Sequence, residues 1–128
     1  MRLGAREAVL KYLLTLGLAA MVNAAQAGEA DVTDVKVTKT GAQTYSFSVT
    51  LKHADEGWDH YANVWEVVAP DGTVLGTRTL YHPHVNEQPF TRSLGGVKIP
   101  ASIQQVTLRG GDSVHGFGGV EMTVSLPQ

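Results

Sequence analysis

The chain has 128 residues, a length typical of one domain, with ten lysine and arginine residues against twelve aspartates and glutamates. A weakly acidic chain without a basic cluster is not expected to bind nucleic acid. Because the sequence contains no cysteine, it offers no disulfide scaffold, thiolate metal site, cysteine nucleophile or cysteine-linked lipid anchor.

Residues 1–27 have the three parts of a secretory signal peptide. A cationic stretch precedes an apolar run of about 11 residues, which is shorter than the roughly 20 needed to span a bilayer. Ala25-x-Ala27 then predicts cleavage before Gly28. We expect a mature domain of residues 28–128 that is periplasmic or secreted and has no stable membrane anchor. The signal takes three basic residues and one acidic residue, which leaves seven basic and eleven acidic residues.

The dominant period beyond residue 30 is two, which is typical of half-buried β-strands. Apolar residues occupy alternate positions over residues 45–51 and again over residues 120–126. Five further strands are predicted near residues 32–38, 61–69, 73–82, 90–94 and 103–109. This pattern favours an all-β fold, a single seven-stranded antiparallel sandwich of the immunoglobulin-like or fibronectin-like type.

The connections between these strands fall into two groups. Residues 39–42, 70–72 and 95–101 are short links, whereas residues 53–60, 83–89 and 110–119 form longer loops. Because the chain of such a sandwich reverses at each connection, the second, fourth and sixth connections should share one end. These are the three long loops, and all the histidines of the chain lie in them or directly beside them: His53, His60, His82, His84 and His115.

The hairpin at residues 69–73 sets the expected spacing of two of these histidines. Pro70-Asp71-Gly72 predicts a three-residue loop that pairs Ala69 with Thr73. If this register continues along the two paired strands, His60 lies opposite His82, with Cβ atoms about 4.5–5.5 Å apart. Two imidazoles at that distance can share one ion. His84 lies two residues further along and should project to the same side.

Imidazole and carboxylate together suit Zn(II) or Cu(II), and the affinity order favours copper. The candidate metal ligands are His60, His82, His84 and His115. The carboxylates near them in sequence, as ligands or as acceptors of the second ring N–H, are Asp59, Glu87 and Asp112. The alternative is a structural polar network in which loop histidines hold no ion.

Three other residues of these loops are candidates for binding. Arg92 should face the core and therefore need a carboxylate partner, with Glu87, Asp59 and Asp112 as candidates; otherwise it presents its charge to an anionic ligand. Trp58 and Phe117, with Tyr61 and Tyr81, either cap the open end of the core or form an aromatic platform. We expect Arg92 to be structural and the rings to cap the core.

The segments 58–62, 82–93 and 112–119 together resemble small exported Ig-like β-sandwich proteins of Gram-negative bacteria. The resemblance covers roughly residues 31–127. It implies a periplasmic single-domain protein and no established activity, ligand or catalytic residue.

The function predicted from the sequence is carriage or buffering of copper or zinc by the histidine cluster. The alternative is a metal-free interaction module that binds an envelope protein or a glycan through the same loops. Enzyme activity is not expected, because no nucleophile elbow surrounds Ser113, the serine beside His115; a hydrolase or oxidase would need an open coordination position on the metal.

Overall fold

The computed structural model describes residues 28–128, and the predicted signal peptide lies outside them. The described chain is all-β and contains no helix, so no helix there could cross a membrane. Its strands are β1 (Asp31–Lys39), β2 (Thr44–Lys52), β3 (Ala62–Val68), β4 (Val74–Thr79), β5 (Phe90–Lys98), β6 (Gln105–Asp112), β7 (Gly116–Phe117) and β8 (Met122–Ser125). The all-β prediction is confirmed, and β7 is a short strand that the sequence pattern did not reveal.

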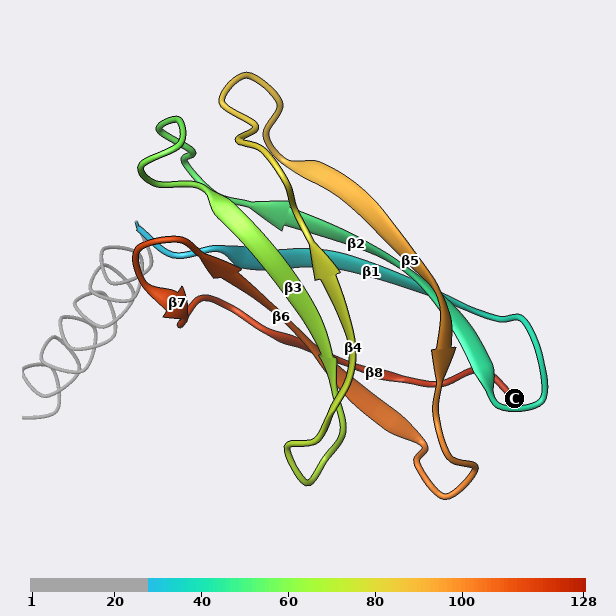
Figure 1. Ribbon diagram of the computed structural model, residues 1–128. Helices are drawn as coiled ribbons and strands as arrows, with labels where there is room; N and C mark the ends of the chain where they lie inside the picture. The colour runs from blue at the N-terminus through green and yellow to red at the C-terminus, as the bar shows by residue number, and fades with distance from the viewer. Residues whose placement is uncertain (1–27) are drawn as a thin grey trace, which may run out of the picture.

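Two antiparallel sheets face each other across one core (Figure 1). One sheet has the order β1-β2-β5, and the other has the order β4-β3-β6, with β7 and β8 both pairing with β6. Alternate residues of β2 enter the core, as the period of two predicts, and Phe47, Val49 and Leu51 are completely buried. Trp65 of β3 packs into the same core from the second sheet.

The hairpin between β3 and β4 has the predicted turn but not the predicted register. The Ala69 N–H donates to the Thr73 carbonyl at 2.8 Å, and Gly72 has a φ of 93°, the left-handed conformation that glycine favours. A bulge between Val67 and Val68 then shifts the ladder by one residue, and the pairing ends at Val64 opposite Thr79. The predicted pairing of His60 with His82 is therefore wrong.

Two of the predicted connections are partly strand. β5 continues through the pair Gly95-Gly96 to Lys98, so residues 95–98 are not a link. β6 continues to Asp112, and a tight turn leads at once into β7, where Gly116 has a φ of 68°. The segment 110–119 is thus a short hairpin and not a long loop. This hairpin fixes Asp112 at the end of a regular strand.

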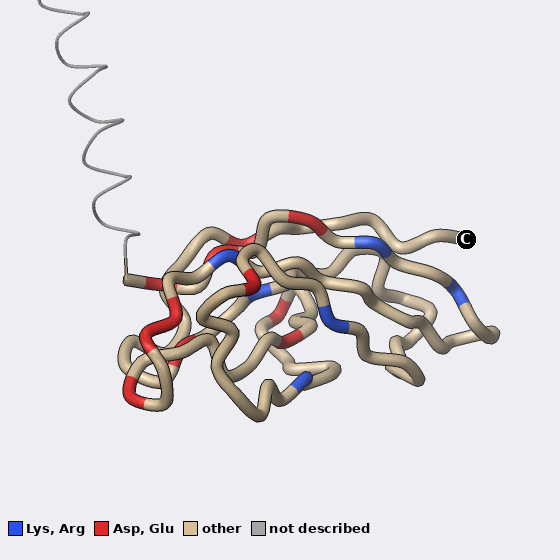
Figure 2. The backbone as a smooth tube through the Cα atoms, turned by 90° about the horizontal axis from the view of Figure 1, so that it is seen from above, with Lys and Arg blue, Asp and Glu red and all other residues tan. Residues whose placement is uncertain are grey.

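The parity of the connections is preserved. The β2–β3, β4–β5 and β6–β7 connections lie at the end of the molecule where the described chain begins (Figure 1). Figure 2 shows acidic residues gathered at this same end. Those at the start of the described chain, within these loops or beside them are Glu29, Asp31, Asp55, Glu56, Asp59, Glu87 and Asp112.

Candidate metal centre

Contacts among the loops join all five histidines at this end, as the parity argument predicts. The ring centroids of His53 and His60 are 4.8 Å apart, and those of His60 and His115 are 5.0 Å apart. His82 and His84 form a second pair, with centroids 4.7 Å apart. The five rings therefore divide into a group of three and a group of two.

Asp55 connects the two groups. Its carboxylate is buried and accepts three hydrogen bonds: from His53 Nδ1 at 2.5 Å, from the Ala62 N–H at 3.1 Å and from the His84 N–H at 2.7 Å. The donors come from the β2–β3 connection, the first residue of β3 and the β4–β5 connection. Gln88 adds a second link, since its side chain accepts from the His53 N–H and donates to the His84 carbonyl.

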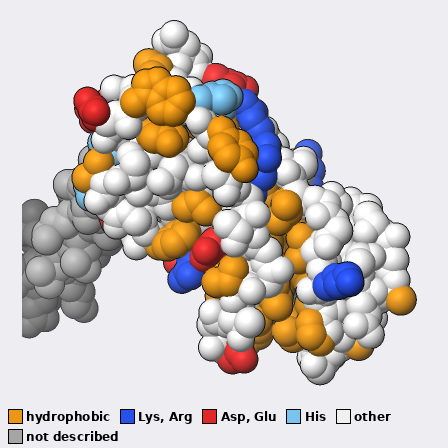
Figure 3. Space-filling view, viewed as in Figure 1, with side chains coloured by type: hydrophobic (Ala, Val, Ile, Leu, Met, Phe, Trp, Pro, Cys, Tyr) orange, Lys and Arg blue, Asp and Glu red, His pale blue; other side chains and the backbone are white. Residues whose placement is uncertain are grey.

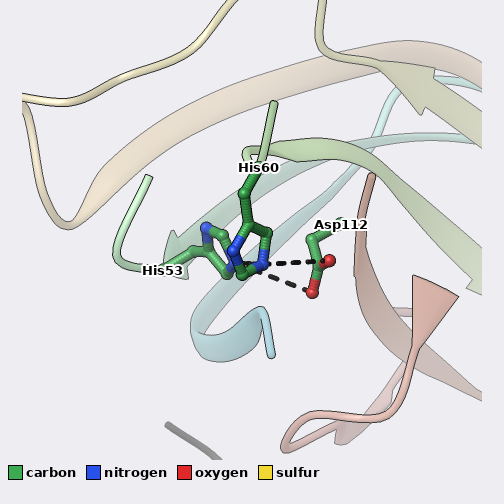
Figure 4. A group of neighbouring side chains, drawn as sticks. All are labelled: His53, His60 and Asp112. Carbon is green, nitrogen blue, oxygen red and sulfur yellow. Dashed lines mark hydrogen bonds and ion pairs between the residues drawn. The ribbon is translucent and has the colours of Figure 1, made fainter. Parts of the chain in front are cut away.

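The group of three is built around two imidazoles that face one another (Figure 4). His53 Nε2 lies 3.3 Å from His60 Nε2. The Asp112 carboxylate lies beside both atoms, 3.6 Å from His53 Nε2 and 3.3 Å from His60 Nε2. The Gly28 carbonyl oxygen is 3.3 Å from the first nitrogen and 3.2 Å from the second. Ligand atoms of His53, His60 and Asp112 all lie within 4.8 Å of one another, a spacing that a single metal ion can bridge.

The outer nitrogen of each facing ring has a carboxylate partner. His53 Nδ1 contacts Asp55, and His60 Nδ1 lies 3.0 Å from Glu56 Oε1. An ionised carboxylate only accepts hydrogen bonds, so both Nδ1 atoms carry the ring proton and both Nε2 atoms are left with a lone pair. The Nε2 atoms, the Gly28 carbonyl and the Asp112 carboxylate are then all acceptors that converge on one point. A metal ion at this point, or a proton on one ring, would satisfy these acceptors.

The surroundings of Asp112 favour its ionised form. Its side chain is fully buried, which by itself raises the pKa of the carboxyl, but hydrogen bonds from the His115 and Val114 backbone N–H groups outweigh that effect. The pKa of Asp112 is therefore lowered below its usual 3.8. The turn between β6 and β7 supplies both N–H groups, which explains why the carboxylate sits at the end of β6.

His60 is the most exposed of the three candidate ligands. Its side chain is 16% exposed, whereas that of His53 is completely buried. Burial alone lowers the pKa of His60, but the hydrogen bond to Glu56 and the charge of Asp112 reverse the effect and raise this pKa above 6.5. The surroundings of His60 thus favour a positive charge at this position.

The group of two lies outside the cluster of His53, His60 and Asp112. Arg92 Nη2 lies 2.9 Å from His84 Nε2, and because arginine can only donate, this nitrogen of His84 must accept. The ring proton is then on Nδ1, which is buried without a hydrogen-bond partner in the described chain. His82 is exposed, and its Nδ1 contacts the Pro83 carbonyl. The structure separates His82 and His84 from the other candidate ligands.

The pKa of His84 gives a direct check of this arrangement. Burial lowers the pKa, and the charge of Arg92 lowers it further, so we expect His84 to titrate below 6.5. Removing that charge in Arg92→Gln should raise the His84 pKa, measured from the ring proton shifts by NMR. Lys98→Gln, which removes a charge at the far end of β5, is the control and should leave it unchanged. An identical His84 pKa in parent and Arg92→Gln would contradict the contact.

Arg92 projects from the core side of β5, as predicted, but it is not buried. β5 is an edge strand, and the Arg92 side chain is 29% exposed, with the ring of Phe90 beneath it. Its carboxylate partner is Glu87, at 3.2 Å, one of the predicted candidates. A pair this exposed contributes about 0–1 kcal/mol, much less than breaking a buried charge pair would cost.

Several other predicted residues lie away from the facing imidazoles. Asp59 is exposed and has no hydrogen bond to a histidine in the described chain, while Glu87 is occupied by Arg92. Trp58 and Tyr81 are 67% and 74% exposed, so the expectation that they cap the core is wrong. Phe117 is exposed as well, at 39%, and the Arg109 guanidinium lies 4.4 Å from its ring centroid.

Four participants were not predicted from the sequence: His53 as a candidate ligand, Asp55 and Glu56 as partners of the ring N–H groups, and Gly28. The spacing His53-x-Asp55 was a usable signal, because neighbours at i and i+2 in an extended segment project to one side. Glu56 precedes His60 by four residues, and Gly57, with a φ of 96°, turns the loop between them. Nothing in the local sequence of Gly28 indicated that its carbonyl would reach the loops.

Comparison with known proteins yields one informative match. The chain is 44% identical over 96 residues to a protein of Halomicrobium mukohataei named "Putative lipoprotein". The aligned region covers 75% of this chain and 47% of that protein. The chain thus spans about half the length of this relative. No family model and no solved structure matches the chain. The relative comes from a halophilic archaeon, so an origin of the family in Gram-negative bacteria stays a prediction.

Proposed function

We propose that this protein is an exported binding and carrier protein for a divalent transition metal, held by His53, His60 and Asp112. One observation carries the proposal: the two Nε2 atoms face each other at 3.3 Å while both Nδ1 atoms contact carboxylates. Metal-ligating histidines characteristically donate the other ring N–H to a carboxylate, which fixes the tautomer and orients the ring. Asp55 and Glu56 occupy the positions that such partners take.

The ligand set favours Cu(II) or Zn(II) over Mg(II). Two imidazole nitrogens with a carboxylate and a carbonyl oxygen are borderline ligands that suit copper and zinc, and copper binds more strongly when both are available. The acidic loops at this end draw cations toward the site (Figure 2). Because two of the three proposed ligands, a histidine and a carboxylate, are buried, storage or delivery of the ion fits the site better than catalytic turnover. We propose no enzyme activity.

Export and fold type complete the proposal. A lipoprotein is an exported protein, so the relative's name supports export of this chain, in agreement with the signal pattern of residues 1–27. The strand orders β1-β2-β5 and β4-β3-β6 with β8 are compatible with the immunoglobulin-like or fibronectin-like sandwich that the strand pattern predicted.

Metal-dependent stability tests the function. Chelator-treated protein should unfold at a higher temperature after Cu(II) or Zn(II) is added, because an ion at a hundredfold excess over its Kd stabilises the fold by about 2.7 kcal/mol. This corresponds to a shift on the order of 10 °C in a domain of this size. Mg(II) should have little effect.

A pair of variants locates the binding. His60→Gln should remove most of the metal-dependent shift, because it replaces a ligand. His82→Gln changes the same residue type in an exposed position at the same end and should retain the shift. An unchanged melting temperature in the parent, or equal shifts in both variants, would refute the proposed site.

The exposed rings favour a second candidate, a metal-free module that binds a protein or glycan. Trp58 and Tyr81 belong to the histidine-end connections, and Figure 3 shows hydrophobic side chains beside a histidine on the upper part of the molecule. Exposed aromatic side chains are enriched at interfaces. This candidate becomes the leading one if the metal titration fails.

A further inference from the structure

Gly28 is placed as a component of the candidate centre. Its carbonyl oxygen lies 3.3 Å from His53 Nε2 and 3.2 Å from His60 Nε2, so it points to the same position as the Asp112 carboxylate. A Cβ atom at residue 28 would lie 2.8 Å from His115 Cε1, closer than ordinary packing allows. The loops therefore close around a residue without a side chain.

The same residue is the expected first residue of the mature chain, because Ala25-x-Ala27 predicts cleavage before it. Resting on the proposed function, we infer that the amino group released by this cleavage is itself a metal ligand. The α-amine and the carbonyl oxygen of Gly28 would bind the ion together, in a five-membered ring of metal, nitrogen, Cα, carbon and oxygen.

The chemistry of the nitrogen makes the ligand depend on processing. In the uncleaved chain the Gly28 nitrogen is an amide, whose lone pair is delocalised into the carbonyl of the preceding residue. After cleavage it is an amine, which can give its lone pair to copper or zinc. His53 Nε2, His60 Nε2, the Asp112 carboxylate and the two Gly28 atoms then supply the nitrogen and oxygen donors that suit Cu(II).

The two Gly28 donors belong to one residue, so they bind the ion as a chelate, and no further segment of the chain has to be ordered. The carbonyl is already directed at the histidines, and the amine is two bonds from the carbonyl carbon, so binding the first donor brings the second to the ion. The full site therefore forms only in the processed protein. Metal binding would therefore be tightest after export and cleavage.

The test compares two processed proteins that differ by one residue. The full chain is expressed with its own leader, beside a variant with one alanine inserted between Ala27 and Gly28, and mass spectrometry establishes both mature termini. Cu(II) affinity is then measured by competition with a chelator of known Kd. The protein that begins at Gly28 should bind at least tenfold more tightly, because the insertion converts its amine into an amide.

A spectroscopic measurement identifies the ligand atom. Protein labelled with ¹⁵N-glycine should show a ¹⁵N hyperfine coupling in the Cu(II) electron–nuclear double resonance spectrum, and the alanine-inserted protein should not. Equal affinities, or a processed chain that begins elsewhere, would overturn the inference and leave the histidine site intact. Failure of both proteins to bind Cu(II) would instead overturn the proposed function.

Discussion

Replacing Asp55 with alanine is expected to lower the free energy of unfolding of the metal-free protein by about 3–5 kcal/mol. The side chains of Asp55 and His53 are both completely buried, and the carboxylate also accepts the backbone N–H groups of Ala62 and His84. Alanine would leave these three donors without an acceptor in a region closed to solvent. Denaturant unfolding followed by circular dichroism, with chelator present, measures the change.

Asp59→Ala is the matched control for this loss. Asp59 belongs to the same loop and carries the same charge, but it is exposed, so its removal should change stability by less than about 0.5 kcal/mol. Asp55→Asn should lie between the two, because the amide oxygen can still accept while the negative charge is lost. Equal midpoints for Asp55→Ala and Asp59→Ala would contradict the central role of Asp55.

The contribution of His60 to stability should reverse its pH dependence when metal is added. The raised pKa of His60 means that its stabilising effect without metal is fully present below its unfolded value of 6.5 and is lost as the pH rises through the folded pKa. With Cu(II) or Zn(II) the proton competes with the ion, so the effect should instead grow between about pH 5 and pH 7.

The difference in unfolding free energy between the parent and His60→Gln isolates this contribution at each pH. His84, whose lowered pKa has the opposite influence, is common to both proteins and cancels. The Asp112 carboxylate, with its pKa below 3.8, stays ionised throughout this range. The metal-free difference should fall above pH 6.5, and the metal-bound difference should be larger at pH 7 than at pH 5. Parallel curves with and without metal would exclude His60 as a ligand.

Local pattern predicted much of the fold. The alternation along residues 45–51 gave β2 its buried face, and Pro70-Asp71-Gly72 gave the β3–β4 turn, because both depend on backbone preferences of a few neighbouring residues. The bulge between Val67 and Val68 could not be predicted in this way. It coincides with Gly76, whose missing Cβ makes room for Leu94 and Val97 of the other sheet, a contact that only the assembled fold reveals.

The end of the molecule at which the candidate site lies was predicted from the sequence, but the residues that form the site were not. Chain reversal at each connection was sufficient to bring the histidine loops together. The selection of His53 and not His82 depends on Asp55, which contacts both loops and turns the His53 ring inward. It also depends on Arg92, which occupies the one nitrogen of His84 that could otherwise bind an ion. These are tertiary contacts that spacing along the chain does not encode.

The three hydrogen bonds accepted by Asp55 also determine how the loops move. Because one carboxylate holds the β2–β3 connection, the start of β3 and the β4–β5 connection, none of them can move away from Asp55 without breaking a hydrogen bond to it. Segments 29 residues apart in sequence thus form one cooperative unit. Their conformational entropy is lost when the domain folds, so an ion bound at the proposed site would meet ligands already in place, and little of its binding energy would be spent on ordering them.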